Sequence, residues 1–222
     1  MDEKRKYKYI LFDLDGTLIY SHKGIFRCIA LALEKLHLPA PTEEQLKKCI
    51  GPSLMYSFTH YFGLDEETAR QATLKYREEY AVTGVYENEE IFGASQALQA
   101  LTEAGYILGL ATSKPEIFAE NICNRLDFSK YLTALVGSGV DGSLHTKALV
   151  IEEALRRLGA TAKQTLMVGD RRHDLEGARA QGVDCALLKV GYAPQGEFEE
   201  VKPEYVFEDF TDLTAFLLKE TV

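Results

Sequence analysis

The sequence is poor in cysteine, and its cysteines are scattered along the chain. No two of them form a Cys-x-x-Cys pair, and none has the spacing to a histidine that a zinc finger requires. This pattern argues against a zinc finger and predicts reduced, mostly buried thiols. A chain of 222 residues buries roughly 70% of its unfolded surface, so it needs neither a disulfide nor a structural metal to fold. The four cysteines are Cys28, Cys49, Cys123 and Cys185.

The sequence also lacks a long apolar run. The first such run, Tyr9–Phe12, is interrupted by Asp13 and is too short for the core of a signal peptide or for a membrane span. The chain contains no internal repeat and no low-complexity segment. These absences favour a globular cytoplasmic protein of enzyme size.

Positive charge is in deficit, because 34 acidic residues face 25 basic ones and the formal net charge is −9. This excess repels the phosphates of nucleic acids and anionic lipid, so neither nucleic acid nor a membrane is expected as a partner. A small phosphorylated molecule can still bind where a cation, a local dipole or a few basic side chains overcome the overall field. We expect a monomer or a homodimer.

The hydrophobic pattern changes twice along the chain. Residues 7–12 predict a strand that ends at Asp13, whereas residues 21–87 contain helical patterns alone, including a capping box at Thr42–Gln45. Further helices are expected over 54–62 and 66–82. From residue 93 onward, strands and helices alternate. The strands are expected at 106–111, 132–136, 165–168, 185–188 and 205–207, and the helices at 94–104, after Pro115, and at 147–158, 174–181 and 211–219.

This alternation predicts an α/β fold with a parallel, Rossmann-like sheet flanked by helices, because right-handed crossovers connect such strands. The first strand has no other partner, so it must join the same sheet. The helical block is then an insertion after that strand. We therefore predict a core formed by residues 1–20 and 88–222, with an inserted all-helical domain over residues 21–87.

Two acidic residues directly follow the first strand. Asp13 and Asp15 stand at its carboxyl end, where ligands bind in parallel sheets. Asp13 and Asp15 are two residues apart on an extended chain, so their side chains point to the same side. Repulsion between the two carboxylates favours a state in which one is protonated and the other is ionised. A reaction that uses one carboxyl group as nucleophile and the other as general acid/base needs this difference in protonation. Gly16 permits the tight turn that follows, although a simple Asx-type turn has the same pattern.

A second acidic pair follows a later strand. Asp170 ends the strand over 165–168, and Asp174 comes one helical turn later, where it is also compatible with a helix N-cap. Four carboxylates that converge on one crevice are costly without a cation. Oxygen ligands with open positions suit Mg²⁺, which keeps water ligands and binds phosphate as well.

Polar and basic residues complete the predicted crevice. Thr112 and Ser113 precede a helix, and their hydroxyls and free backbone N–H groups make an anion seat that Lys114 can also reach. An ordinary helix cap is the alternative. Lys147 opens its helix, where its charge opposes the helix dipole. This placement is useful if the ammonium points into an anionic crevice, and it otherwise indicates a surface lysine.

These motifs together resemble a known family. Phe12-Asp-Leu-Asp-Gly-Thr-Leu18 resembles the first motif of the haloacid dehalogenase superfamily of phosphohydrolases. Thr112 matches the second motif, Lys147 the third, and Gly169-Asp170 with Asp174 the fourth, in the family's order across nearly the whole chain. The forms Gly-Asp-Arg-x-His-Asp, Ala111–Pro115 and Val140–Gly142 resemble a phosphoglycolate phosphatase/5′-nucleotidase-like branch. The helical insertion is similar to the cap of subfamily I.

The resemblance implies a role for each matched residue. Asp13 would attack phosphorus and form an aspartyl-phosphate, and Asp15 would protonate the leaving oxygen and then activate the hydrolytic water. Thr112 and Lys147 would hold the transferring phosphoryl group. Mg²⁺ would lie on Asp13, the backbone carbonyl of Asp15 and Asp170, with Asp174 acting through water. The implied activity is the hydrolysis of a small phosphomonoester such as phosphoglycolate, a nucleoside monophosphate or a sugar phosphate.

The helical block is expected to close over the crevice and to carry specificity. Its candidates for contact with the leaving group are Gly51, in the loop up to Ser53, and Arg77, although a helix–helix turn and a surface arginine explain them equally well. In the core, Gly16, Ser113 and Lys114 are the expected substrate contacts, and Arg171 is a further basic side chain in reach of the anion. Two places depart from the family pattern, namely Tyr20 and the segment Gly191–Gly196.

Four other functions match parts of the sequence. Gly137–Gly142 fits the G-x-G-x-x-G pattern of a dinucleotide site, but no helix opens at its last glycine, which argues against an oxidoreductase that binds NAD. Asp15 argues against a haloacid dehalogenase, which needs no acid two residues after its nucleophile. A sugar phosphomutase keeps both acids and is the main alternative. The complete set of acids, hydroxyl and lysine argues against an inactive binding module.

Overall fold

The computed structural model describes residues 5–219, so the outermost parts of the predicted core, residues 1–4 and 220–222, lie outside the described residues. The chain forms two compact units. Residues up to Leu18 and from Glu90 onward form the first, which we call the core unit, and Ile19–Glu89 form the second, the helical unit.

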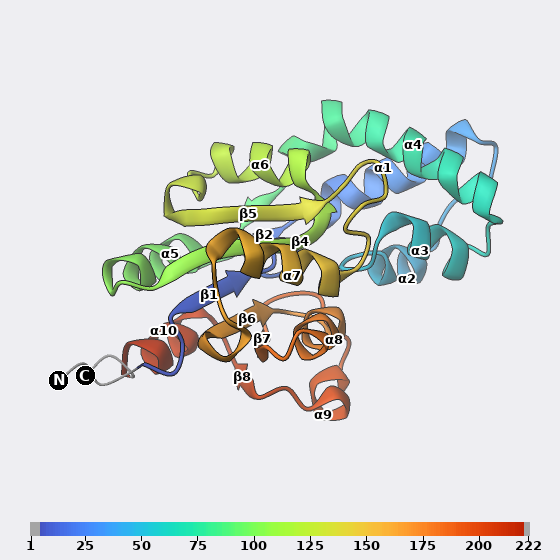
Figure 1. Cartoon of the computed structure of the whole chain (residues 1–222). Helices are drawn as coiled ribbons and strands as arrows, with labels where there is room; N and C mark the ends of the chain where they lie inside the picture. Colours follow the sequence, from blue (N-terminus) through green and yellow to red (C-terminus); the bar gives the residue numbers. More distant parts are fainter. Residues whose placement is uncertain (1–4, 220–222) are drawn as a thin grey trace. The chain divides into compact units, whose positions relative to one another are not determined.

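The core unit is built on a parallel sheet of six strands in the order β5-β4-β1-β6-β7-β8 (Figure 1). Both β1 and β6 are buried along their whole length, as expected for central strands of a sheet that is covered on both faces. The predicted Rossmann-like α/β fold is confirmed. The strands are β1 (Tyr9–Phe12), β4 (Ile107–Pro115), β5 (Leu132–Ser138), β6 (Thr165–Gly169), β7 (Asp184–Leu188) and β8 (Tyr205–Phe207).

Helices flank this sheet on both faces. Helices α7 (Lys147–Leu158) and α8 (Arg172–Ala180) pack on each other, and their buried side chains form a core with Leu11, Met167 and Cys185 of the strands. Alternate strand residues point the other way and are also fully buried. Helices α5 (Ala94–Glu103) and α10 (Phe210–Lys219), which pack on each other, flank that opposite face, and α6 (Glu116–Arg125) packs against β4 and β5 (Figure 1).

The helical unit contains four helices, α1 (His22–Lys35), α2 (Glu43–Lys48), α3 (Leu54–His60) and α4 (Glu66–Val82). Their starts follow from local capping. Thr42 and Gln45 form the predicted capping box of α2, and Asp65 accepts a hydrogen bond from the backbone N–H of Thr68 at the start of α4. Helices α1 and α4 pack against each other, and α1 buries Ile25, Cys28, Ile29, Ala32 and Leu33, which repeat every three or four residues along one face.

Some short elements were not predicted. Strands β2 (Ile19–Tyr20) and β3 (Glu89–Glu90) pair where the chain enters and leaves the helical unit, and α9 (Glu197–Val201) follows β7. Short 3₁₀ turns lie at Gly84–Tyr86, Ser129–Tyr131 and Ala162–Gln164. All four cysteines are free and buried, as predicted. Among residues 5–219, no helix has the length and apolar character that crossing a membrane requires.

Candidate active site

Strands β1 and β6 of the core unit end side by side at one edge of the sheet, and the neighbouring strand β4 runs past this edge to Pro115. Phe12 of β1 pairs with Leu110 of β4 on one side and with Val168 of β6 on the other. The chain therefore delivers Asp13, Thr112 and Asp170 to the same edge, and their exposed fractions are only 3%, 1% and 0%. The backbone N–H of Asp13 donates to the carbonyl of Val168 at 2.9 Å, which fixes the acid at the strand end.

Lys147 enters this edge from α7. It is the first residue of that helix, directly after the N-cap Thr146, and its side chain is buried. Its Nζ lies 2.7 Å from Asp13 Oδ1 and 2.8 Å from Asp174 Oδ1, and it donates to the carbonyl of Ala111 at 3.2 Å. Burial by itself would lower the pKa of Lys147, but the two carboxylates outweigh it and raise this pKa. The ammonium thus remains charged inside the acidic crevice.

Asp15 has a lysine of its own. Lys114 Nζ donates to both oxygens of the Asp15 carboxylate, at 2.9 and 2.8 Å, and both side chains are largely buried. The backbone N–H of Lys114 in turn donates to Thr112 Oγ1 at 3.3 Å. The two acids of the first motif are therefore held by different cations, Asp13 by Lys147 and Asp15 by Lys114. The sequence predicted Lys114 as a contact of the substrate anion, and its pair with Asp15 was not predicted.

Asp13, Asp170 and Asp174 form a tight acidic cluster, with one oxygen of each within 4.8 Å of the others. Asp174 is the third residue of α8, and its Oδ2 accepts from the backbone N–H groups of Asp170 and Arg171 at 3.2 and 3.1 Å. The alternative that Asp174 is the helix N-cap is therefore wrong, because Arg171 occupies that position. Asp174 instead ties the strand end to the start of the helix.

The cluster holds uncompensated negative charge. Burial is the main reason that the pKa of Asp13 rises to about 6, and the nearby Asp174 and Asp15 carboxylates add to it against the opposing effect of Lys147. Burial, and then Asp174, also raise the pKa of Asp170 well above its usual range. Asp170 Oδ1 is buried and accepts no hydrogen bond from any residue in the described range.

A divalent cation fits this arrangement. The four acids Asp13, Asp15, Asp170 and Asp174 face two lysines, Lys114 and Lys147, so two negative charges have no lysine partner when all four are ionised. The free Oδ1 of Asp170 and the neighbouring oxygens of Asp13 and Asp174 are hard donors of the kind that Mg²⁺ prefers.

The remaining predicted residues have different surroundings. Gly16 adopts φ +84°, and a Cβ at this position would lie 2.3 Å from Asp170 Oδ2, so glycine is required here. Ser113 is partly exposed, and its carbonyl accepts from the Ser138 hydroxyl at 2.8 Å. Gly51 and the partly buried Arg77 belong to the helical unit, and their contact with substrate stays a prediction.

The residues that hold Asp170 and the two arginines after it in place were not predicted from the sequence. Asp170 Oδ2 accepts a hydrogen bond from the backbone N–H of Tyr192 at 2.6 Å, and the buried Glu197 carboxylate contacts Arg171 and Arg172. The Tyr192 donor is a backbone N–H group, which every residue except proline has, so no sequence pattern could indicate this contact. Glu197 lies in an acidic stretch where solvent exposure is the usual expectation, so only its burial at 7% exposure sets it apart.

Comparison with known proteins places this site in context. Residues 10–188 match the family model of the haloacid dehalogenase-like hydrolases. A 5′-nucleotidase from Pseudomonas aeruginosa is 38% identical over 216 residues, which cover 97% of this chain and 98% of that protein. A phosphoglycolate phosphatase from Aliivibrio fischeri is 28% identical over 218 residues, which cover 95% and 96%.

Two further relatives broaden the picture. The tyrosine-protein kinase PtkA from Mycobacterium tuberculosis is 34% identical over 183 residues, which cover 82% of this chain but 62% of that protein. The crystal structure of a predicted phosphatase from Clostridium acetobutylicum superposes with a TM-score of 0.92 at 34% identity, covering 96% of this chain and 99% of that one. These matches extend over both units of the chain.

Proposed function

The chain belongs to the haloacid dehalogenase-like hydrolases and is a phosphatase, and on this premise we propose that it hydrolyses a small phosphomonoester through an aspartyl-phosphate on Asp13 with the help of Mg²⁺. The main support for the proposal is that Asp13 lies close to Asp170, Asp174 and Lys147 at one edge of the sheet. This arrangement supplies a nucleophile, a cation site and a fixed positive charge within a few ångströms of one another.

Each of these residues would have its own role in the reaction. Asp13 attacks phosphorus through one carboxylate oxygen, and the bond to the leaving oxygen breaks. In its protonated form, Asp15 gives a proton to that leaving oxygen, and the resulting carboxylate later accepts one from the water that hydrolyses the aspartyl-phosphate. Thr112 and Lys147 bind the phosphoryl oxygens, where fixed positive charge lowers the barrier.

Asp13, Asp170, Asp174 and the backbone carbonyl of Asp15 would hold the Mg²⁺. When bound, the cation neutralises the charge that crowds on the phosphoryl oxygens. Asp170 Oδ1 supports this assignment, because a buried carboxylate oxygen without a hydrogen bond is costly unless a cation occupies it. We also assign to the helical unit the function of a cap that excludes bulk water and selects the leaving group, with Gly51 and Arg77 as its contacts.

The substrate class can be tested directly. We expect the purified protein to release inorganic phosphate from nucleoside 5′-monophosphates in preference to phosphoglycolate and sugar phosphates, because the relative that is 38% identical over nearly all of both chains is named a 5′-nucleotidase. The measurement is kcat/KM for each ester from phosphate release. Preference for phosphoglycolate would reassign the substrate within the same reaction, whereas an isomerised sugar phosphate without released phosphate would favour the mutase alternative.

The Lys114–Asp15 pair gives a sharper test of the proposed acid. If Lys114 positions Asp15, Lys114→Met should lower kcat/KM for alkyl phosphates by roughly 10²-fold or more, the size of a general-acid contribution. The same variant should change p-nitrophenyl phosphate hydrolysis far less, because p-nitrophenolate departs without a proton. The value of kcat/KM reports the step in which the leaving group departs.

A matched control is Lys130→Met, since Lys130 is exposed and pairs with Asp127 on the surface. We expect this control to resemble the wild type with both esters. An equal loss with both esters in Lys114→Met would instead show that Lys114 binds the phosphoryl group, as the sequence first suggested.

A further inference from the structure

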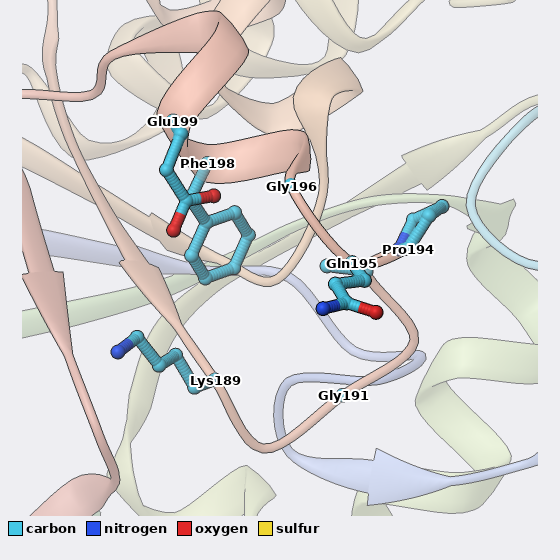
Figure 2. Close-up of a pocket in the computed structure, with 8 residues that line it drawn as sticks. Lys189, Gly191, Pro194, Gln195, Gly196, Phe198 and Glu199 are labelled. Carbon is cyan, nitrogen blue, oxygen red and sulfur yellow. The ribbon is translucent and has the colours of Figure 1, made fainter.

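The loop between β7 and α9 shows how closely a backbone approaches the acids of this site. Figure 2 labels Gly191 in this loop. A Cβ on Gly191 would lie 2.0 Å from Asp170 Oδ2 and 2.2 Å from the carbonyl oxygen of Gly16, so only glycine permits this approach. A second glycine of this kind, Gly137, lies in β5 on the other side of β1. It is the first glycine of the G-x-G-x-x-G pattern, to which the proposed reaction assigns no function.

Strand β4 bulges where it passes this glycine. Ala111 of β4 pairs with Val136 of β5. The next pair is formed by Pro115 and Ser138, so residues 112–114 of β4 lie opposite a single residue of β5. A bulge of this kind bends its strand and turns side chains in a new direction, and bulges are common beside active sites. This bulge contains the threonine and the lysine of β4 that the proposed reaction uses.

Gly137 is the single residue opposite the bulge, and it lies against the main chain of β4. A Cβ on Gly137 would lie 2.6 Å from the carbonyl oxygen of Lys114 and 2.6 Å from both the backbone nitrogen and the Cα of Glu116. All three atoms belong to the main chain, which cannot rotate aside as the end of a side chain can. A larger residue would therefore push the segment from Lys114 to Glu116 away from β5.

Two hydrogen bonds between β5 and this segment hold it in place. Ser138 Oγ donates to the carbonyl oxygen of Ser113 at 2.8 Å. The backbone N–H of Gly137 donates to Glu116 Oε2 at 3.0 Å. A bulge disrupts the regular ladder, and its backbone groups need other partners because an unpaired buried group is costly.

Glu116 is held from a second direction as well. Arg157 Nη1, on α7, donates to Glu116 Oε1 at 3.1 Å and to the carbonyl oxygen of Leu135 in β5 at 2.7 Å. Each oxygen of the Glu116 carboxylate thus has a partner, one on β5 and one on α7. The start of α6, where the bulged segment ends, is therefore fixed by contacts outside the bulge.

The course of the bulge determines where the ammonium of Lys114 lies. Its Nζ donates to both oxygens of Asp15, so a shift of the Lys114 backbone would move the ammonium relative to that acid. We propose that Gly137 and Ser138 are positioning residues, which hold the β4 bulge where Lys114 reaches Asp15. This role rests on the proposed function, in which Asp15 is the general acid and Lys114 orients it.

Gly137→Ala tests the role through the leaving group. It should lower kcat/KM for alkyl phosphates by roughly 10²-fold, because misplacing a catalytic group by about 1 Å costs about that much. It should change p-nitrophenyl phosphate hydrolysis far less, because that leaving group departs without a proton. The ratio of the two kcat/KM values therefore reports the acid, whereas general damage to the fold would lower both values alike.

Gly109→Ala is the matched control, because Gly109 lies in β4 but outside the bulge. A Cβ on Gly109 would have the ends of the Leu11 and Leu158 side chains as its nearest contacts, at 2.9 and 3.1 Å. These flexible ends can move without a shift of the main chain. We expect this control to keep the wild-type ratio of the two kcat/KM values, even if its thermal midpoint falls.

Ser138→Ala keeps the proposal testable if Gly137→Ala does not fold. It adds no atom and removes only the hydrogen bond to Ser113, so it should lower kcat/KM for alkyl phosphates by roughly 5-fold, the scale of one hydrogen bond. Its p-nitrophenyl phosphate value should hardly change. The control is Ser129→Ala, since the Ser129 hydroxyl donates to the Asn124 side chain on the surface.

A double variant shows whether the two positions act through the lysine. Gly137→Ala or Ser138→Ala, added to Lys114→Met, should change the ratio of the two kcat/KM values no further, because the group that they position is already gone. A further change of this ratio would show that they act by another route, and it would overturn the proposal.

The remaining outcomes separate this role from the proposed function. A wild-type ratio in Gly137→Ala or in Ser138→Ala would overturn the role of that residue while leaving the proposed reaction in place. An equal loss with both esters in Lys114→Met would remove the orientation of Asp15 by Lys114, and this role with it. If the wild type releases phosphate from no phosphomonoester, the proposed function and the positioning role both fall.

Discussion

Replacing Asp13 with asparagine is expected to reduce phosphate release by roughly 10⁴-fold or more, the scale of losing a nucleophile that acts together with its neighbours. Asparagine has nearly the same shape, but its neutral amide oxygen does not form the acyl phosphate. Steady-state hydrolysis of p-nitrophenyl phosphate with Mg²⁺ present measures this loss. This ester is the right probe because its leaving group needs no acid, so the assay reports the nucleophile rather than Asp15.

The fold should survive this change. Lys147 keeps its contact with Asp174 at 2.8 Å and its hydrogen bond to the Ala111 carbonyl, so its charge is not left alone. We expect circular dichroism and the thermal midpoint to remain close to those of the wild type. Asp65→Asn is the matched control, because Asp65 caps α4 in the helical unit and asparagine caps helices equally well. Near-normal turnover by the Asp13 variant would refute the nucleophile.

Removal of Mg²⁺ is the second change for which we expect a large effect. With EDTA, activity should fall by roughly 10³-fold, because a cation on the phosphoryl oxygens is worth several kcal/mol of transition-state stabilisation. Added Mg²⁺ should restore the rate. It should also raise the thermal midpoint, since it binds the folded acidic cluster and not the unfolded chain.

Asp170→Asn provides the comparison for this experiment. The variant loses the carboxylate whose Oδ1 has no hydrogen bond from the described residues, so Mg²⁺ should neither restore its activity nor raise its midpoint to the wild-type extent. Full activity of the wild type in excess EDTA would remove the cation from the mechanism.

Much of the fold could be predicted because its signals are local. Helices α4 and α7 begin and end at the predicted residues, since capping side chains and apolar spacing are properties of neighbouring residues. Strand β4 extends beyond its predicted end at Ala111 to Pro115, where it pairs irregularly with β5. Helix α9 was missed because its five residues carry little apolar periodicity, and its position depends on contacts with α8.

The site was predictable to the extent that topology determines it. Once β1 was assigned to a parallel sheet, Asp13 and Asp170 had to lie along the same edge of that sheet. The strand order, which the sequence did not predict, places β1 between β4 and β6 and so brings Asp13, Thr112 and Asp170 together. The pairing of each acid with its lysine was not predictable. Whether Lys114 reaches Asp15 or the substrate depends on side-chain directions, and the link between Glu197 and Arg171 joins residues that no sequence motif connects.

The place of β1 in the sheet has a consequence for biosynthesis. This strand is translated well before β4 and β6, although it lies between them in the sheet. Until β6 emerges, the nascent β1 lacks hydrogen-bond partners along one side and remains a candidate for chaperone binding or aggregation. A ribosome stalled before residue 165 would thus carry a chain with the nucleophile already translated but no catalytic centre assembled around it.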